Sequence, residues 1–202
     1  MVPIPLNIKN IKAVVFDLDN TLVSSKINFQ GLREQLNCPM HQDILTHADS
    51  FLEAADRERA HKLILDHELS DAQNSVSLSG CHSLLHYLKD NHFHTGIVTR
   101  NCAEASKCKL DHCNITVEEV ISREQYAPKP SPEALTALAD LWQLQPHQVL
   151  YVGDYLYDLE AANNANMPSC LITHGEVKPF ESLASLSVNQ LDDLLSYIQR
   201  YG

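Results

Sequence analysis

Two carboxylates lie two positions apart, directly after a short apolar run near the start of the chain. Asp17 and Asp19 follow residues 13–16, Ala-Val-Val-Phe, whose β-branched and aromatic side chains are typical of a strand buried on both faces. Side chains two positions apart share a face of an extended strand, and buried carboxylates need a cation or strong hydrogen bonds. Mg²⁺ prefers such oxygen ligands. The pair therefore indicates a divalent-cation site, although the motif alone is more often a strand end with an Asp-Asn turn.

Three further polar motifs lie at or beside the ends of predicted elements. They are Thr99-Arg100-Asn101, Lys129 between two prolines, and Gly153-Asp154 with Asp158 four residues on. Taken singly, each has a structural interpretation: a strand-end turn, an exposed turn, and a carboxylate in the first turn of a helix. In parallel α/β sheets, however, ligands bind at the carboxyl ends of the strands. The order and placement of the motifs therefore favour one shared site.

Strand and helix patterns alternate along most of the chain. Predicted strands cover residues 13–16, 95–99, 149–153 and 169–173, with a short one within 115–121. Amphipathic helices are predicted between them, and residues 188–198 carry the apolar stripe of a C-terminal helix. Such alternation predicts an α/β fold, a doubly wound Rossmann-like parallel sheet with right-handed crossovers.

One segment breaks this alternation. From residue 29 to about residue 74 the pattern is helical and β-branched residues are scarce. We therefore expect a core domain of residues 1–22 and 78–202, and a small helical cap of residues 23–77 inserted after the first strand. The cap is too small for an independent domain, and it is either a lid over the site or a helical pair that covers the sheet edge.

The composition limits the classes of partner. The 202 residues suit one domain with a small insert, and 44% hydrophobic residues with only 6 glycines indicate an ordered globular protein. A formal net charge of −11 argues against a long nucleic-acid interface. The chain shows neither a signal-peptide pattern nor an apolar stretch of the ~20 residues that a membrane helix needs, so we expect a cytoplasmic protein with no membrane partner. No two of the six cysteines have the C-x₂-C spacing, and free thiols are expected.

The four motifs, in this order, resemble those of the haloacid dehalogenase (HAD) superfamily, most of whose members are Mg²⁺-dependent phosphatases. The resemblance covers essentially the whole chain, and the helical insert is similar to the small C1 cap of the phosphoglycolate-phosphatase-like branch. It implies that Asp17 is the nucleophile that forms an aspartyl-phosphate and that Asp19 is the general acid and base. Tyr155 departs from the superfamily, where Ser or Thr is frequent at this place.

The resemblance also implies which residues would bind Mg²⁺ and which would bind the substrate. Mg²⁺ would be held by the carboxylate of Asp17, by the backbone carbonyl of Asp19 and by Asp154, with Asp158 bound to the ion either directly or through another ligand. The remaining residues would bind the substrate: Lys129 and Thr99 through their side chains, Leu18 and Arg100 through their backbone amides, and Asn101 beside them.

Three alternatives remain at this point. A phosphosugar mutase would share Asp17 and Asp19, and a non-catalytic module would keep the site for Mg²⁺ or phosphate without turnover. A true dehalogenase is disfavoured, because it needs no acid such as Asp19. The expected substrate is a small phosphorylated metabolite, and the protein is a monomer or a homodimer. The possible substrate-reading cations of the cap, which a solvated helix face explains equally well, are Lys26, Arg33, Arg57, Arg59 and Lys62.

Overall fold

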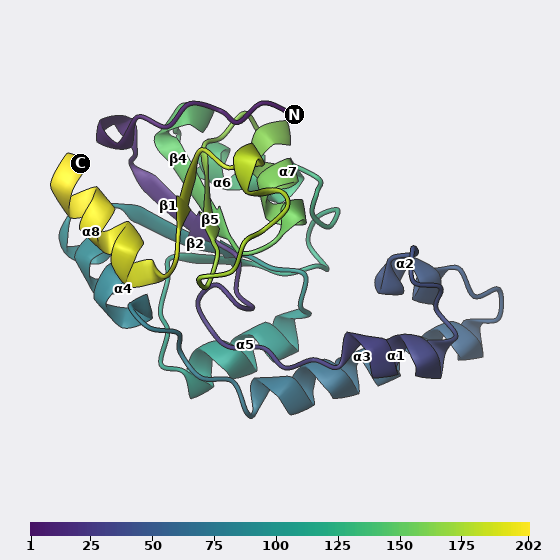
Figure 1. The fold of residues 1–202 in the computed structure, drawn as a ribbon. Helices are drawn as coiled ribbons and strands as arrows, with labels where there is room; N and C mark the ends of the chain where they lie inside the picture. The colour runs from purple at the N-terminus through teal and green to yellow at the C-terminus, as the bar shows by residue number, and fades with distance from the viewer.

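A central parallel sheet organises the molecule, which is described here by a computed structural model of residues 1–202 (Figure 1). Its strands lie in the order β3-β2-β1-β4-β5-β6, and every pairing is parallel. The strands are β1 (Ala13–Phe16), β2 (His94–Val98), β3 (Glu119–Ile121), β4 (Val149–Gly153), β5 (Ser169–Ile172) and β6 (Leu186–Val188). The first strand is central, with Ala13 in register with His94 on one side and Val149 on the other. The predicted doubly wound sheet is confirmed.

Helices cover both faces of the sheet, because alternate residues of β1 face opposite sides. Val14 and Phe16 lie in a core cluster with residues of α4 and α8, whereas Ala13 and Val15 lie in a second cluster with residues of α6 and α7. Figure 1 shows the two helix pairs on opposite sides of the strands. The helices of this part are α4 (Cys81–Asp90), α5 (Ala103–His112), α6 (Glu133–Leu141), α7 (Leu156–Asn164) and α8 (Leu191–Tyr201).

The residues after β1 form three helices that project to one side of the sheet (Figure 1). They are α1 (Phe29–Leu36), α2 (Ile44–Asp49) and α3 (Ala54–Ala72), and they share a small apolar core of their own that includes Leu32, Ile44 and Ile64. The long helix α3 packs against α5. The division into a core of 1–22 and 78–202 and a cap of 23–77 stays a prediction.

Two linkers connect these helices to the sheet and lie side by side. The backbone N–H of Ser24 donates to the Val76 carbonyl at 2.8 Å, and that of Leu78 donates to the Leu22 carbonyl at 2.9 Å. The pairing is antiparallel, and Val23 and Ser77 form a β-bridge within it. The helical segment therefore leaves and re-enters the sheet-bearing part at one place.

The sequence prediction was wrong at the C-terminus. Val188 was assigned to the last helix because its spacing to Leu191 and Leu195 fits a helical stripe, but it ends the edge strand β6 and pairs with Ile172. A strand of three half-buried residues carries too little alternation to be recognised. All six cysteines are free, as predicted. None of the helices combines the length and the apolar character needed to cross a bilayer.

Candidate active site at the carboxyl ends of the strands

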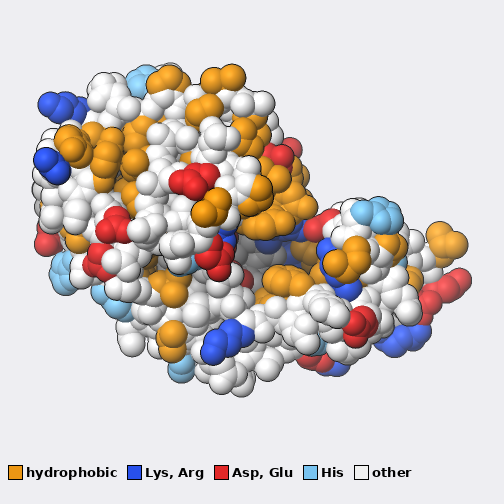
Figure 2. All heavy atoms as spheres, in the orientation of Figure 1, with side chains coloured by type: hydrophobic (Ala, Val, Ile, Leu, Met, Phe, Trp, Pro, Cys, Tyr) orange, Lys and Arg blue, Asp and Glu red, His pale blue; other side chains and the backbone are white.

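A cavity of about 490 Å³ lies between the sheet and the projecting helices. Figure 2 shows the corresponding hollow between the two parts of the molecule. Among its 24 lining residues are eight of the nine predicted site residues: Asp17, Asp19, Thr99, Arg100, Asn101, Lys129, Asp154 and Asp158. The ninth, Leu18, has its side chain buried in the main core, so only its backbone can serve the site.

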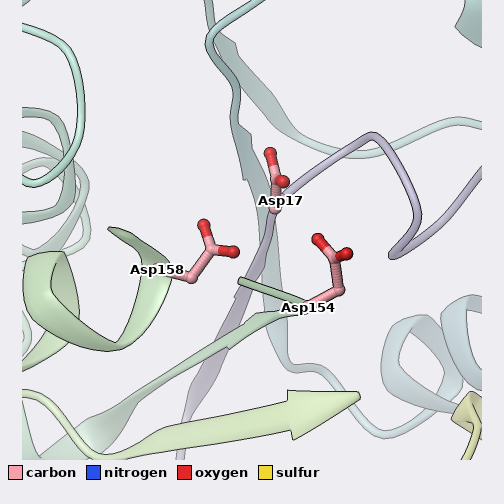
Figure 3. Close-up of side chains that lie close together, drawn as sticks. All are labelled: Asp17, Asp154 and Asp158. Carbon is pink, nitrogen blue, oxygen red and sulfur yellow. The ribbon is translucent and has the colours of Figure 1, made fainter. Parts of the chain in front are cut away.

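Three carboxylates from three segments converge in this cavity. Asp17 follows β1, Asp154 follows β4, and Asp158 lies in the first turn of α7, and each offers an oxygen within 4.8 Å of the others (Figure 3). Burial raises the pKa of Asp17 to about 7 even though Lys129 opposes the shift, and burial with the neighbouring Asp17 and Asp158 raises the pKa of Asp154 to about 8. Buried carboxylates this close together can be ionised at the same time only beside a cation, and an all-oxygen donor set fits Mg²⁺.

Lys129 supplies one positive charge to this cluster. Its Nζ lies 2.8 Å from Asp17 Oδ1 and 2.7 Å from Asp158 Oδ1, and it donates to the Tyr151 hydroxyl at 3.0 Å. Burial opposes the charge, but Asp158 and Asp17 outweigh that effect and raise the pKa of Lys129 well above its ordinary value. Lys129 therefore stays charged. Sequence reasoning missed Tyr151, whose hydroxyl also donates to the Val98 carbonyl at 3.2 Å.

The glycine before Asp154 has a steric role. A Cβ on Gly153 would lie 2.3 Å from Cγ of Asp158, so any side chain would displace that carboxylate. Asp158 is also fixed by the backbone N–H of Tyr155, which donates to its Oδ2 at 3.0 Å. Gly153 therefore leaves room for the Asp158 carboxylate, and Asp154, the next residue, places its own carboxylate at the end of β4.

Asp19 does not continue the strand but lies in a tight turn. Asn20 adopts the left-handed conformation with φ of 53°, and the backbone N–H groups of Leu22 and Val23 both donate to the Leu18 carbonyl. The turn leaves the Asp19 carboxylate facing the cavity, where Asn101 Nδ2 donates to it at 2.9 Å. Asn101 is therefore bound to the predicted acid and base.

A second buried lysine, which sequence reasoning missed, holds Asp19. Lys109 of α5 is fully buried, forms an ion pair with Asp19, and forms another with Asp71 of α3 at 2.8 Å. Burial opposes its charge, but Asp19 and Asp71 outweigh burial and raise the pKa of Lys109. One signal was available: Lys109 follows Ala105 and Ser106 at helical spacing on the buried face of α5.

The Thr-Arg-Asn motif is divided between the site and the projecting helices. Thr99 is buried, and its Oγ1 accepts a hydrogen bond from the Asn101 N–H at 3.1 Å. The Arg100 guanidinium forms an ion pair with Asp43, which caps α2, and its Cζ lies 5.2 Å from the centroid of the Tyr157 ring. The Arg100 side chain is thus already paired in the cavity wall.

The five possible substrate-reading cations differ in their position relative to the cavity. Only Arg33 lines the cavity, and its Nη1 donates to the carbonyls of Pro39 at 2.8 Å and Gln42 at 2.7 Å. It therefore holds a loop in place. Lys26 lies outside the cavity lining, and the other three serve local structure: Arg57 binds the carbonyls of Phe51 and Leu52, Arg59 pairs with Asp56, and Lys62 pairs with Asp66.

Known proteins resemble this chain over most of its length. It is 27% identical to a haloacid dehalogenase-like hydrolase domain-containing protein of Arabidopsis thaliana, covering 94% of this chain and 82% of that protein. It is 25% identical to a phosphoglycolate phosphatase of Rhodospirillum rubrum, covering 92% and 88%. The crystal structure of a hydrolase from Pseudomonas syringae has the same fold, with a TM-score of 0.77, 17% identity, and coverage of 94% and 98%.

The family model described as haloacid dehalogenase-like hydrolase matches residues 14–172. That range includes all four motifs and the projecting helices. The resemblance predicted from the motifs is thereby confirmed, and the chain belongs to the haloacid dehalogenase-like hydrolase family.

Proposed function

We propose that the protein is a Mg²⁺-dependent phosphatase that hydrolyses a small phosphomonoester through an aspartyl-phosphate on Asp17. The observation that carries this proposal is the convergence of Asp17, Asp154 and Asp158 within 4.8 Å, with Lys129 bound to two of them. Carboxylate attack on an anionic phosphoryl group is opposed by charge, so a nucleophile needs cations beside it. The relatives named phosphoglycolate phosphatase support the same chemistry.

The three carboxylates would hold Mg²⁺, together with the backbone carbonyl of Asp19. When bound, the ion would neutralise charge on the transferring phosphoryl group. Lys129 would add a fixed positive charge beside Asp17. Thr99 and the backbone N–H groups of Leu18 and Arg100 would donate to the phosphate oxygens.

The chain supplies the groups for two successive steps, formation and hydrolysis of the aspartyl-phosphate. An oxygen of Asp17 forms a bond to phosphorus while the bond to the leaving oxygen breaks, and Asp19 gives that oxygen its proton. Asp19 then takes a proton from water, whose oxygen attacks phosphorus and breaks its bond to Asp17, which releases phosphate. Hydrogen bonds from Asn101 and Lys109 keep the Asp19 carboxylate beside the cavity during both steps.

We further propose that the segment of residues 23–77 acts as a cap that closes over the cavity. It supplies part of the cavity wall through Phe29, Arg33 and Asp43, and paired linkers join it to the sheet at one place. Closure of such a segment would exclude water during formation of the aspartyl-phosphate.

The proposal is tested by phosphate release from p-nitrophenyl phosphate and a panel of metabolite phosphates, with Mg²⁺ and with EDTA. Release that needs the metal and is lost in Asp17→Asn is expected. In H₂¹⁸O, the product phosphate of a hydrolase carries the heavy oxygen, whereas a mutase returns a phosphorylated isomer without it. No turnover of any ester by a folded protein that binds Mg²⁺ would refute the proposal and favour a binding module.

A further inference from the structure

Large apolar side chains border the cavity and are open to solvent. Phe29 and Met40 of the helical segment are 57% and 80% exposed, and Tyr155 at the start of α7 is 54% exposed. Nine of the 24 lining residues are hydrophobic. Exposed apolar side chains that gather at a concave site are typical of a surface that a ligand covers.

The charged side chains that line the cavity also limit the kind of ligand that it can bind. Its lining holds six acidic side chains, three of which are the proposed Mg²⁺ ligands, together with His41 and His67 and three permanent cations, Arg33, Arg100 and Lys129. Lys129 is bound to two carboxylates, and Arg33 is bound to backbone carbonyls of its own loop. Neither Lys129 nor Arg33 is therefore free to bind a second anionic group on the substrate.

Arg100 is the remaining cation, and Asp43 neutralises it. Their ion pair joins the end of β2 to the helical segment, and both side chains are about two-thirds buried, with exposed fractions of 27% and 31%. Glu68, another acid of the lining, forms an ion pair with Arg123, so Arg123 is not available to bind an anion either. A carboxylate on the leaving group would be repelled by Asp43, which already neutralises Arg100 in the cavity wall.

We propose that the preferred substrate is the phosphomonoester of an uncharged alcohol or phenol whose apolar portion lies against Phe29, Met40 and Tyr155. A leaving group with its own carboxylate, such as that of phosphoglycolate, is disfavoured by the Arg100–Asp43 pair. This inference rests on the proposed phosphatase activity and adds the class of leaving group to it. A cavity of about 490 Å³ accommodates an aromatic ring with a short chain.

A matched pair of esters tests the charge rule. 3-Phenylpropyl phosphate and its analogue with a carboxylate at ring position 4 have leaving alcohols of nearly the same acidity, because the carboxylate is remote from the reacting oxygen. We expect kcat/KM to be at least about tenfold higher for the uncharged ester, as one unfavourable charge contact costs about that factor. Equal or higher kcat/KM for the carboxylated ester would overturn the inference.

The Asp43→Asn variant gives the sharper result. Asparagine can still cap α2, but it frees the Arg100 guanidinium, so the carboxylated ester should gain about tenfold relative to the uncharged one. The added substitution Arg100→Met should abolish that gain. Asp66→Asn, which removes an exposed carboxylate paired with Lys62 on α3, is the control and should leave the ratio unchanged. A folded Asp43→Asn protein with an unchanged ratio would overturn the role of the pair.

The apolar wall is tested separately. Phe29→Ser should raise KM for 3-phenylpropyl phosphate more than for methyl phosphate, whereas Leu52→Ser, at an apolar residue that is 94% exposed and outside the cavity lining, should change neither. An equal effect of Phe29→Ser on both esters would contradict the placement of the apolar portion. If no ester is hydrolysed, even p-nitrophenyl phosphate, the phosphatase proposal fails and this inference falls with it.

Discussion

Two buried lysines each form ion pairs with two carboxylates, but they connect different parts of the fold. Lys129 lies between Asp17 and Asp158, both at the carboxyl ends of the sheet, whereas Lys109 lies between Asp19 at the sheet and Asp71 on α3. The first cluster, Asp17, Lys129 and Asp158, lies entirely within the sheet-bearing part of the fold. The second joins the predicted acid and base to the projecting helices.

The two lysine clusters would therefore serve two different tasks in one active site. In the proposed phosphatase, the Lys129 cluster would fix charge around the phosphoryl group and would gain from rigidity. The Lys109 cluster ties Asp19 to the linker region, because Asp71 also accepts from the Lys26 N–H at 2.6 Å and from Ser25 Oγ at 2.9 Å. Movement of the helical segment would therefore move a partner of the lysine that holds Asp19.

The largest effect is expected from Lys129→Met. Methionine removes the charge that opposes the three carboxylates, so kcat should fall by about 10²–10³ in a steady-state phosphatase assay. Breaking a buried ion pair also costs stability, about 3–5 kcal/mol. Lys107→Met, at an exposed lysine paired with Asp111 on α5, is the matched control and should keep nearly full activity. A folded Lys129→Met protein as active as that control would contradict the role of the first cluster.

Lys109→Met should have a smaller and more selective effect. Loss of the contact leaves Asp19 held by Asn101 alone, and misplacement of a catalytic group by about 1 Å costs about 10²-fold. Because Lys109 acts through the acid, alkyl phosphates with poor leaving groups should lose more kcat than p-nitrophenyl phosphate, which needs little protonation. Equal losses for both esters would show that Lys109 is only structural.

Removal of Mg²⁺ should act in a pH-dependent way. Burial, with Asp17 and Asp158, raises the pKa of Asp154 from 3.8 to about 8. The metal-free folded protein thus holds this proton more tightly than the unfolded chain, and the stability that the group contributes falls as pH rises from 3.8 toward 8. Mg²⁺ must displace the proton, so its binding strengthens over the same range. The increase in melting temperature at fixed Mg²⁺ should grow from about pH 6 to about pH 8.

The Asp154→Asn variant is the control for that measurement. Without the Asp154 carboxyl, the Mg²⁺-dependent increase in melting temperature should be small at both pH values, and it should change less between them, because only Asp17, with a pKa of about 7, still titrates in this range. A wild-type increase that is equal at the two pH values would contradict the link between metal binding and this carboxyl.

The residues of the first cluster could be predicted from the sequence because local signals mark each of them. Asp17 and Asp154 directly follow apolar strand patterns, and parallel strands bring such ends to one edge of the sheet. Asp158 and Lys129 were added by the resemblance of their motifs. The sheet itself was predicted for the same reason, since strand and helix patterns alternate along the chain.

The second cluster could not be predicted in this way. Lys109 and Asp19 are 90 positions apart, and Arg100 and Asp43 are 57 apart, on elements whose relative placement no local pattern determines. The Arg100–Asp43 pair forms only because the helices after β1 lie beside the sheet, whereas the Lys109–Asp19 pair joins α5 to the turn after β1. A charged residue on the buried face of a predicted helix, as Lys109 is, was the one usable signal.

The smallest effect, and the one that separates the two clusters most directly, is expected from Asp71→Asn. Asparagine keeps an oxygen for the Lys26 N–H, and its amide nitrogen can donate to Ser25 Oγ, but it removes the charge beside Lys109. The free energy of unfolding should therefore fall by about 1–3 kcal/mol in urea denaturation. Asp66→Asn on the exposed side of the same helix should cost less than about 0.5 kcal/mol. Because Asp71 does not touch the cavity, kcat should change only for poor leaving groups, through Lys109. Equal stability losses in the two variants, with kcat unchanged for every ester, would mean that the second cluster neither stabilises the junction nor positions Asp19.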